Sequence, residues 1–89
     1  MSVESFTAKI QASLRIQIPV LLRWKYKLDP GAILKVQITQ TNPPRRARFY
    51  ARMQKSGRIA IPKLTAETMQ LQKSDVVEVM VWIQQPSIV

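Results

Sequence analysis

Basic side chains are concentrated in the middle of the chain. Eight of them, and no acidic residue, lie between Lys35 and Lys63, within a sequence whose net charge is +9. A guanidinium group can donate two parallel hydrogen bonds to a phosphate, and a basic patch attracts polyanions from a distance. The asymmetry predicts a nucleic acid as the first candidate partner and an anionic membrane surface as the second. The alternative is a basic protein whose charge only keeps it dispersed.

Residues suited to catalysis or metal binding are scarce. The chain has no Cys and no His, and its five acidic residues are scattered, with Asp75 and Glu78 the only two at a spacing that pairs them on one face. It has no Gly-rich phosphate loop and no nucleophile–base pair. We therefore expect no enzyme, no metal site and no cofactor. Asp29 and Asp75 are better explained as turn formers.

The chain contains an internal duplication. When the sequence is shifted by 43 positions, residues 6–40 align without a gap on residues 49–83, and 11 of the 35 aligned pairs are identical. A segment of about 40 residues is at the lower limit for independent folding. Each repeat is therefore expected to cover the apolar face of the other. We predict one domain over residues 1–89, with repeats 6–40 and 49–83 and a linker at 41–48.

Each repeat is expected to contain two strands, a helix and a third strand. In the first repeat, apolar and polar residues alternate over 6–11 and 15–18, and the short segment between them suits a hairpin turn. Pro19 ends the second strand and introduces a helix over 20–28, with Leu21 and Leu28 on one face. The third strand is expected at 33–39. The second repeat is expected to have strands at 49–54, 58–61 and 76–83 and a helix at 62–71.

Six short strands are expected to close on themselves, because closure removes exposed sheet edges. The predicted fold class is mainly β, a six-stranded closed barrel with pseudo-twofold symmetry built from two β-β-α-β halves. We expect Met1–Ser5 to be a loose end, 41–48 to be a stiff linker rich in turn residues, and Gln84–Val89 to be a tail.

The second repeat carries the motif of a known family. Ser56-Gly57-Arg58-Ile59-Ala60-Ile61-Pro62, a short helix, and then Leu71-Gln72-Lys73-Ser74-Asp75-Val76-Val77-Glu78-Val79 resemble the SpoVT/AbrB DNA-binding domain, which includes MazE-type antitoxins. The segments 13–19 and 28–32 are a degraded second match. In the first repeat Leu14 stands at the position of the turn glycine, and the helix surfaces of the two repeats differ, which argues against recognition of a palindromic site.

The resemblance implies both a fold and a function. Members of that family are usually homodimers in which each chain supplies half of an interlaced barrel, so a tandem copy implies a monomer that is an intrachain pseudo-dimer. Among the related cradle-loop barrels, six strands favour the RIFT type over the double-psi and swapped-hairpin types. Single-chain archaeal RIFT-type relatives of AbrB are the nearest resemblance. The implied function is DNA binding by a prokaryotic, archaeal transcription regulator or chromatin-type protein.

The expected binding surface is formed by two twin-related hairpins. By alternation, Lys9, Arg15, Arg52 and Arg58 point outward, and closure of the barrel is expected to bring them onto one surface. Arg15, Arg58 and Arg23 match basic positions of the family motif. The alternative is a solvated strand face whose arginines pair with acidic residues such as Glu78 or Asp75. The residues predicted to bind nucleic acid are Lys9, Arg15, Arg23, Arg45, Arg46, Arg48, Arg52, Lys55 and Arg58.

Three aromatic residues are expected at the surface. Tyr50 and Trp82 point outward by alternation, and Trp24 is on the outside of the first helix. Such rings can stack on unpaired bases, or they can cover the ends of a barrel or anchor a protein partner. The alternative function is therefore a barrel that has lost DNA binding and serves as a protein-interaction scaffold, with RNA binding as a further variant. No stretch approaches the roughly 18 apolar residues of a membrane span and no signal peptide is present, so we expect a cytoplasmic protein without membrane contact.

Overall fold

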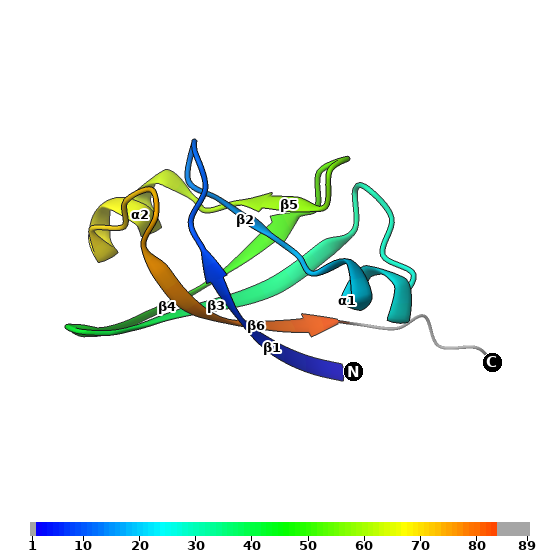
Figure 1. The fold of residues 1–89 in the computed structure, drawn as a ribbon, viewed down its shortest axis with the longest axis horizontal. Helices are drawn as coiled ribbons and strands as arrows, with labels where there is room; N and C mark the ends of the chain where they lie inside the picture. Colours follow the sequence, from blue (N-terminus) through cyan, green and yellow to red (C-terminus); the bar gives the residue numbers. More distant parts are fainter. Residues whose placement is uncertain (1, 84–89) are drawn as a thin grey trace.

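The protein has six β-strands and two short helices, which we describe for residues 2–83 of a computed structural model (Figure 1). The mainly β fold and the strand–strand–helix–strand order of each repeat are as predicted. The first repeat comprises β1 (Ser2–Lys9), β2 (Arg15–Gln17), α1 (Val20–Lys25) and β3 (Ile33–Thr41), and the second comprises β4 (Pro44–Arg52), β5 (Arg58–Ala60), α2 (Lys63–Met69) and β6 (Val76–Ile83).

Strand pairing interleaves the two repeats. The larger sheet has the order β1-β6-β3-β4 and the smaller sheet pairs β2 with β5, so each of the four ladders joins a strand of one repeat to a strand of the other. The strand register follows the duplication, in that residues 43 positions apart occupy equivalent places in the sheet. Phe6 is opposite Val79 in the β1–β6 ladder, and their counterparts Phe49 and Val36 are opposite each other in the β4–β3 ladder. The arrangement therefore has a pseudo-twofold axis that passes between β3 and β6 and between β2 and β5.

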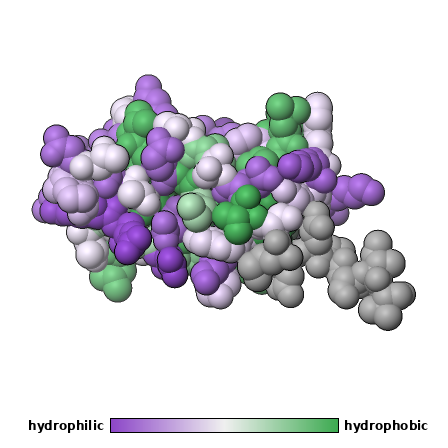
Figure 2. Space-filling model, turned by 90° about the horizontal axis from the view of Figure 1, so that it is seen from below, coloured by the Kyte–Doolittle hydropathy of each residue, from purple (hydrophilic) through white to green (hydrophobic). Residues whose placement is uncertain are grey.

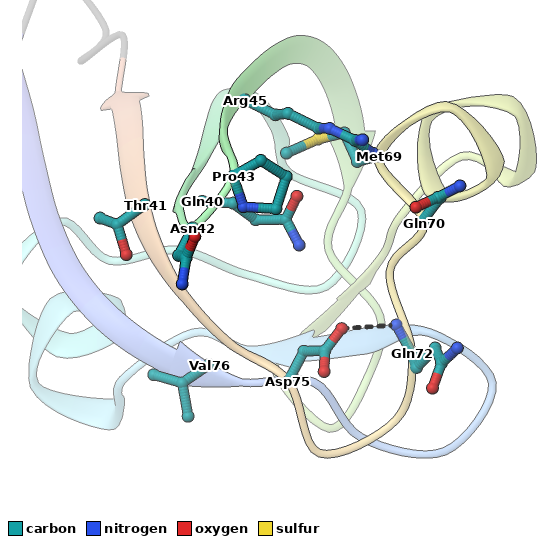
Figure 3. Close-up of a pocket in the computed structure, with 10 residues that line it drawn as sticks. All are labelled: Gln40, Thr41, Asn42, Pro43, Arg45, Met69, Gln70, Gln72, Asp75 and Val76. Carbon is teal, nitrogen blue, oxygen red and sulfur yellow. Dashed lines mark hydrogen bonds between the residues drawn. The ribbon is translucent and has the colours of Figure 1, made fainter.

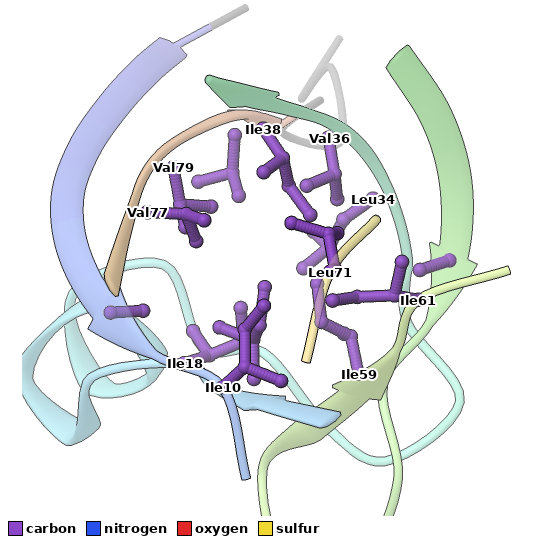
Figure 4. Close-up of a cluster of buried hydrophobic side chains, with 14 of the residues drawn as sticks. Ile10, Ile18, Leu34, Val36, Ile38, Ile59, Ile61, Leu71, Val77 and Val79 are labelled. Carbon is purple, nitrogen blue, oxygen red and sulfur yellow. The ribbon is translucent and has the colours of Figure 1, made fainter. Parts of the chain in front are cut away.

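The core lies between the two sheets (Figure 4). Leu34, Val36 and Ile38 point inward from β3, and the inward residues of β6 meet them from the other repeat. Ile16 and Ile59, which are opposite each other in the β2–β5 ladder, are completely buried on the far side of the core. The predicted inward positions of all six strands are buried or partly buried, as the alternation of apolar and polar residues indicated.

The strands do not form a closed barrel, and this part of the fold prediction is wrong. β1 and β4 are the two edges of the larger sheet, whereas β2 and β5 pair only with each other. Two hydrogen bonds extend the β2–β5 ladder by one residue at each end, from the Ile18 amide to the Gly57 carbonyl and from the Ile61 amide to the Leu14 carbonyl, both 2.9 Å long.

The hairpin expected within the first repeat is reduced to one bridge. Gln11 pairs with Arg15, while β1 runs on beside β6 and β2 crosses to β5. The same happens at the corresponding turn of the second repeat, where the Gln54 amide donates to the Arg58 carbonyl. The alternation of apolar and polar residues locates the strands along the sequence, but it does not identify the strand with which each one pairs.

Two further boundary predictions are wrong. Within the predicted loose end, Met1–Ser5, residues 2–5 form the start of β1, and Ser2 pairs with Ile83. The segment 41–48 is not a linker, because Thr41 pairs with Pro44 and only Asn42 and Pro43 lie between the two strands. Pro44 is tolerated there because it begins an edge strand of the sheet. The predicted tail, 84–89, lies outside the described residues.

The helices are shorter than predicted. α1 follows Pro19 and ends at Lys25, and Lys27 has a positive φ of 53°. α2 follows Pro62 and ends before Gln70, which is left-handed. Leu21 is 70% exposed, whereas Leu28 packs on the core. The prediction that these two residues lie on one face is therefore wrong. No helix of the described residues has the length and apolar composition needed to cross a membrane.

Glu4 ties β1 to α1. Its carboxylate accepts a hydrogen bond from the Tyr26 hydroxyl and lies 3.1 Å from the Lys25 ammonium. These two contacts, that of Tyr26 first, lower the pKa of Glu4 below its usual 4.5. The same carboxylate raises the pKa of Lys25. The cluster has no counterpart in the second repeat, where Ala47 corresponds to Glu4.

The Glu4 contacts predict a small acid sensitivity of folding. Because the folded-state pKa is lowered, the contribution is present above about pH 4.5 and is lost as the pH falls through the folded-state pKa. Glu4→Gln should therefore lower the melting temperature at pH 7, and the difference from the wild type should shrink toward pH 3. Thermal melts across that range measure it, with Glu67→Gln, an exposed acid on α2, as the control. A difference that does not change with pH would contradict the assignment.

The interleaved ladders predict that one repeat cannot fold alone as a monomer. A fragment of residues 1–42 retains none of the four ladders, since the partner of each of its strands is in the second repeat. We expect it to lack stable β-structure in far-ultraviolet circular dichroism at low concentration. Addition of a fragment of residues 43–89 should restore the signal. A stably folded monomer of 1–42 by itself would refute the interleaved arrangement.

Candidate nucleic-acid interface

The predicted basic residues are divided between the two sheets. Arg15 and Arg58 point outward from the small β2–β5 sheet, and Arg23 and Lys55 are near its ends. Alternation places Lys9, Arg46, Arg48 and Arg52 on the outward face of the larger sheet, opposite in each strand to the buried positions. The structure thus separates Arg15 and Arg58 from Lys9 and Arg52, because the two sheets face away from each other across the core. Arg45 is on neither face, and its guanidinium lies 3.4 Å from the Thr68 carbonyl of α2.

Arg15 and Arg58 are held side by side by the β2–β5 register. Arg15 is opposite Ala60, and Arg58 is opposite Gln17, so the two arginines are diagonal neighbours on the outward face. The Nε of Arg58 donates to the Oε1 of Gln17 at 3.4 Å, and the Nε2 of Gln17 donates to the Ser56 carbonyl at 2.9 Å. Gln17 therefore links one arginine to the turn before β5.

Arg23, on α1 of the first repeat, extends this group. Its Nε donates to the Ile18 carbonyl at 3.2 Å, and its guanidinium lies so close over Gly57 that an added Cβ there would be 2.5 Å from its Cζ. Gly57 also has a positive φ of 80°, which glycine adopts without steric strain. The absence of a side chain at Gly57 is therefore what makes room for the guanidinium. We call Arg15, Arg23, Lys55 and Arg58 the small-sheet cluster.

The pseudo-symmetric position has no such cation. There Leu14 replaces Gly57 and Ala66 replaces Arg23, although the backbone is the same: Leu14 also has a positive φ, 55°, and accepts the equivalent hydrogen bond. Leu14 and Ala66 line a common surface depression. At one end of the β2–β5 ladder Gly57 lies under Arg23, and at the other end Leu14 and Ala66 occupy the equivalent positions. Only the first of these two ends therefore carries a cation.

The outward face of the larger sheet combines cations with aromatic rings. The Lys35 ammonium lies 5.3 Å and the Arg48 guanidinium carbon 5.6 Å from the centre of the Trp82 ring. Arg48 also donates from Nε to the Oε1 of Gln37 at 2.7 Å. Tyr50 is 71% exposed on the same face. Lys35 was not among the predicted binding residues, although the alternation of its strand placed it outward.

The acidic residues do not neutralise these arginines. Among residues 2–83 the one ion pair joins Lys25 to Glu4. Glu78 accepts a hydrogen bond from the Thr7 hydroxyl, and the Asp75 carboxylate accepts one from the Gln72 amide, which is its predicted role in a turn. The alternative in which Glu78 or Asp75 pairs with the arginines is therefore not observed. Both basic surfaces keep their charge available for a ligand.

A polar cavity of about 340 Å³ lies where the β3–β4 turn meets α2 and the start of β6 (Figure 3). Its rim carries four side-chain amides, those of Gln40, Asn42, Gln70 and Gln72, together with the carboxylate of Asp75. Asp75 faces the Gln72 backbone and is the one acidic residue among those that line the cavity, which also include Thr41 and Arg45. The described residues contain no cluster of three or more metal-ligand side chains.

The fold and these surfaces define a small, duplicated, mainly β protein with two basic faces. No protein-family model matches the sequence, and no curated protein matches it either. Among solved structures, the solution structure of PHS018 from Pyrococcus horikoshii is similar, with a TM-score of 0.83 and 25% identical residues. The similarity covers 99% of this chain and 100% of that chain, so the two folds correspond over their whole length.

The close approach of Arg23 to Gly57 predicts that even a small side chain at position 57 destabilises the protein. Gly57→Ala should destabilise the protein by about 1–2 kcal/mol, because an L-residue is strained at this positive φ. It should also push the Arg23 guanidinium away from the Ile18 carbonyl. Chemical denaturation measures the first effect, and the Arg23 Nε–H resonance reports the second. Ser56→Ala, one residue earlier, should change neither, and an unaltered stability of Gly57→Ala would contradict the turn geometry.

Proposed function

We propose that this protein is a nucleic-acid-binding protein of the SpoVT/AbrB type, which contacts the phosphates of DNA through the small-sheet cluster. The observation that supports this most directly is the convergence of Arg15, Arg23 and Arg58 from both repeats on one side of the molecule, with no carboxylate of residues 2–83 paired to them. Guanidinium groups placed together in this way suit the spacing and charge of a phosphate backbone.

The family resemblance agrees with the local structure of the motif. Gly57 has a positive φ in the turn, Arg58 begins β5, and Pro62 precedes α2, an order of turn, strand and helix that supports the resemblance. We further propose that the fold is a relative of the RIFT-type cradle-loop barrels. The support is the pairing of two β-β-α-β repeats about a pseudo-twofold axis, in a protein whose fold resembles that of an archaeal one.

The asymmetry of the cluster favours binding without a palindromic target. Only one of the two symmetry-related ends of the β2–β5 ladder carries a guanidinium, that of Arg23, since Ala66 is the equivalent residue at the other end. A reader of two identical half-sites would need matched residues on both repeats. We therefore propose phosphate-dominated binding of DNA, as in a chromatin-type protein or a regulator with weak sequence preference, in the cytoplasm and as a monomer.

Charge reversal in the cluster tests this proposal. Arg15→Glu combined with Arg58→Glu should weaken duplex DNA binding by tenfold or more, since hydrogen bonds to charged groups contribute about 1.5–3 kcal/mol each. The slope of log affinity against log salt should fall by about 2, one for each lost phosphate contact. Fluorescence anisotropy at several salt concentrations measures both quantities.

The matched control is Lys27→Glu combined with Lys73→Glu, which changes the net charge equally at exposed sites outside the cluster. It should weaken binding only slightly. Affinity that does not depend on salt, or an equal loss in both double variants, would refute the proposed site.

A second candidate function is a protein-interaction module. The specific observation is an apolar group on α1, where Leu21 is 70% and Trp24 71% exposed and Val20 is beside them. Exposed Trp residues of this kind are frequent anchors of protein interfaces. The other proposed anchor, Trp82, lies among cations instead. Absence of DNA binding, together with concentration-dependent quenching of Trp24 fluorescence, would favour this candidate.

A further inference from the structure

One row of side chains crosses the outward face of the larger sheet on all four strands. Strand register aligns Val3 with Trp82, Trp82 with Lys35, and Lys35 with Tyr50. Neighbouring strands are about 4.8 Å apart, so the two aromatic residues, separated by one strand, are about 10 Å apart. Lys35 lies between them in the row.

Both aromatic residues are placed for contact with a flat ligand. Tyr50 is 71% exposed, and it projects from the edge strand β4. Trp82 is flanked by the long side chains of Lys35 and Arg48, which can turn from the indole ring toward phosphates of a bound chain. Arg46 and Arg52 lie on the same outward face of β4, on opposite sides of Tyr50 along the strand. Figure 2, seen from the side of this sheet, shows mostly hydrophilic residues with separate apolar groups among them.

The fold does not require this chemistry. The pseudo-twofold axis converts the row of Val3, Trp82, Lys35 and Tyr50 into the row of Arg46, Thr39, Glu78 and Thr7, which occupies the same sheet in the same register. In that second row threonines stand in place of both aromatic residues, and Glu78 replaces Lys35. Since the equivalent backbone is stable with Thr and Glu, the aromatic and cationic residues of the first row are not needed to cover the core.

We propose that this face binds single-stranded nucleic acid, with unpaired bases stacked on Tyr50 and Trp82 and phosphates held by Lys35, Arg48 and Arg52. Aromatic rings accept any base, because every base has a flat face, and basic residues beside them follow the backbone. Bases of a duplex are already stacked on each other, so they do not reach these rings. The inference rests on the proposed function, in that the ligand is a nucleic acid, but it uses the opposite side of the core from the small-sheet cluster.

Four oligonucleotides of equal length separate the contributions. Labelled oligothymidine, oligouridine, an abasic oligomer and a duplex, each of about 12 nucleotides or base pairs, fit the length that one small domain covers. We expect oligothymidine or oligouridine to bind more tightly than the abasic oligomer, whose backbone has the charge but not the bases. The two pyrimidine oligomers distinguish a DNA from an RNA strand.

The decisive variants change the exposed ring. Tyr50→Ala should weaken single-strand binding by about tenfold, which corresponds to the loss of one stacked base, and leave duplex binding unchanged. Tyr50→Phe, which keeps the ring, should bind like the wild type. Trp24→Ala removes an equally exposed aromatic residue from α1 and should have no effect on single-strand binding. Thermal melts of each variant confirm that the fold is retained.

The outcomes distinguish this inference from the proposed function. Equal binding of oligothymidine and the abasic oligomer, or single-strand binding that Tyr50→Ala does not alter, overturns the stacking site, while the effect of the small-sheet cluster on duplex binding stands. Tyr50-dependent single-strand binding without duplex binding supports the stacking site and refutes the duplex site. Failure to bind any of the four oligonucleotides overturns both.

Discussion

The mutual burial of the apolar faces of the two repeats is the interaction on which the rest of the structure depends. Each of the four ladders joins one repeat to the other, and the fully buried Ile16 and Ile59 meet across the pseudo-twofold axis. Burial of a side chain of this size stabilises by about 1.5–3 kcal/mol, and a repeat of about 40 residues alone has too little core to offset its conformational entropy. Neither repeat is therefore a lobe of its own, and both of the proposed binding faces are built from residues of both repeats.

The duplication explains why the inside of the molecule is more symmetric than the outside. Positions such as Val36 and Val79 are identical because both fill the same space in the core, and a change of volume there is costly. Outward positions carry no such constraint, so the two halves have diverged there. The Arg23–Gly57 contact and the Trp82–Lys35–Tyr50 row each occur once, because the symmetry-related positions carry other residues. The row on the larger sheet thus arises where the two copies differ, whereas the small-sheet cluster combines Arg15 and Arg58, which both copies share, with Arg23, which only the first copy has.

The alternation of side chains made most of the secondary structure and the core predictable. Inward positions such as Leu34 and Ile59 could be assigned because a strand turns its side chains to opposite faces with a period of two. The candidate site was predictable only in part. The basic residues were identified, but Lys9 and Arg52 were grouped with Arg15 and Arg58 on one surface. The structure separates them, because β1 and β4 belong to one sheet and β2 and β5 to the other.

The sequence by itself determined the repeat, the strand-forming segments, the turn at Gly57 and the excess of positive charge, since these follow from local periodicity and composition. Only the tertiary structure decided which strands pair, that the sheets stay open, and that Arg23 lies over a turn 34 positions further along the chain. The backbone hydrogen-bonding groups of every strand are chemically alike, so they do not specify which strands pair. Partners are selected instead by contacts between side chains far apart in the sequence. Local patterns therefore fix the faces of each strand, and only packing against the whole molecule selects its neighbours.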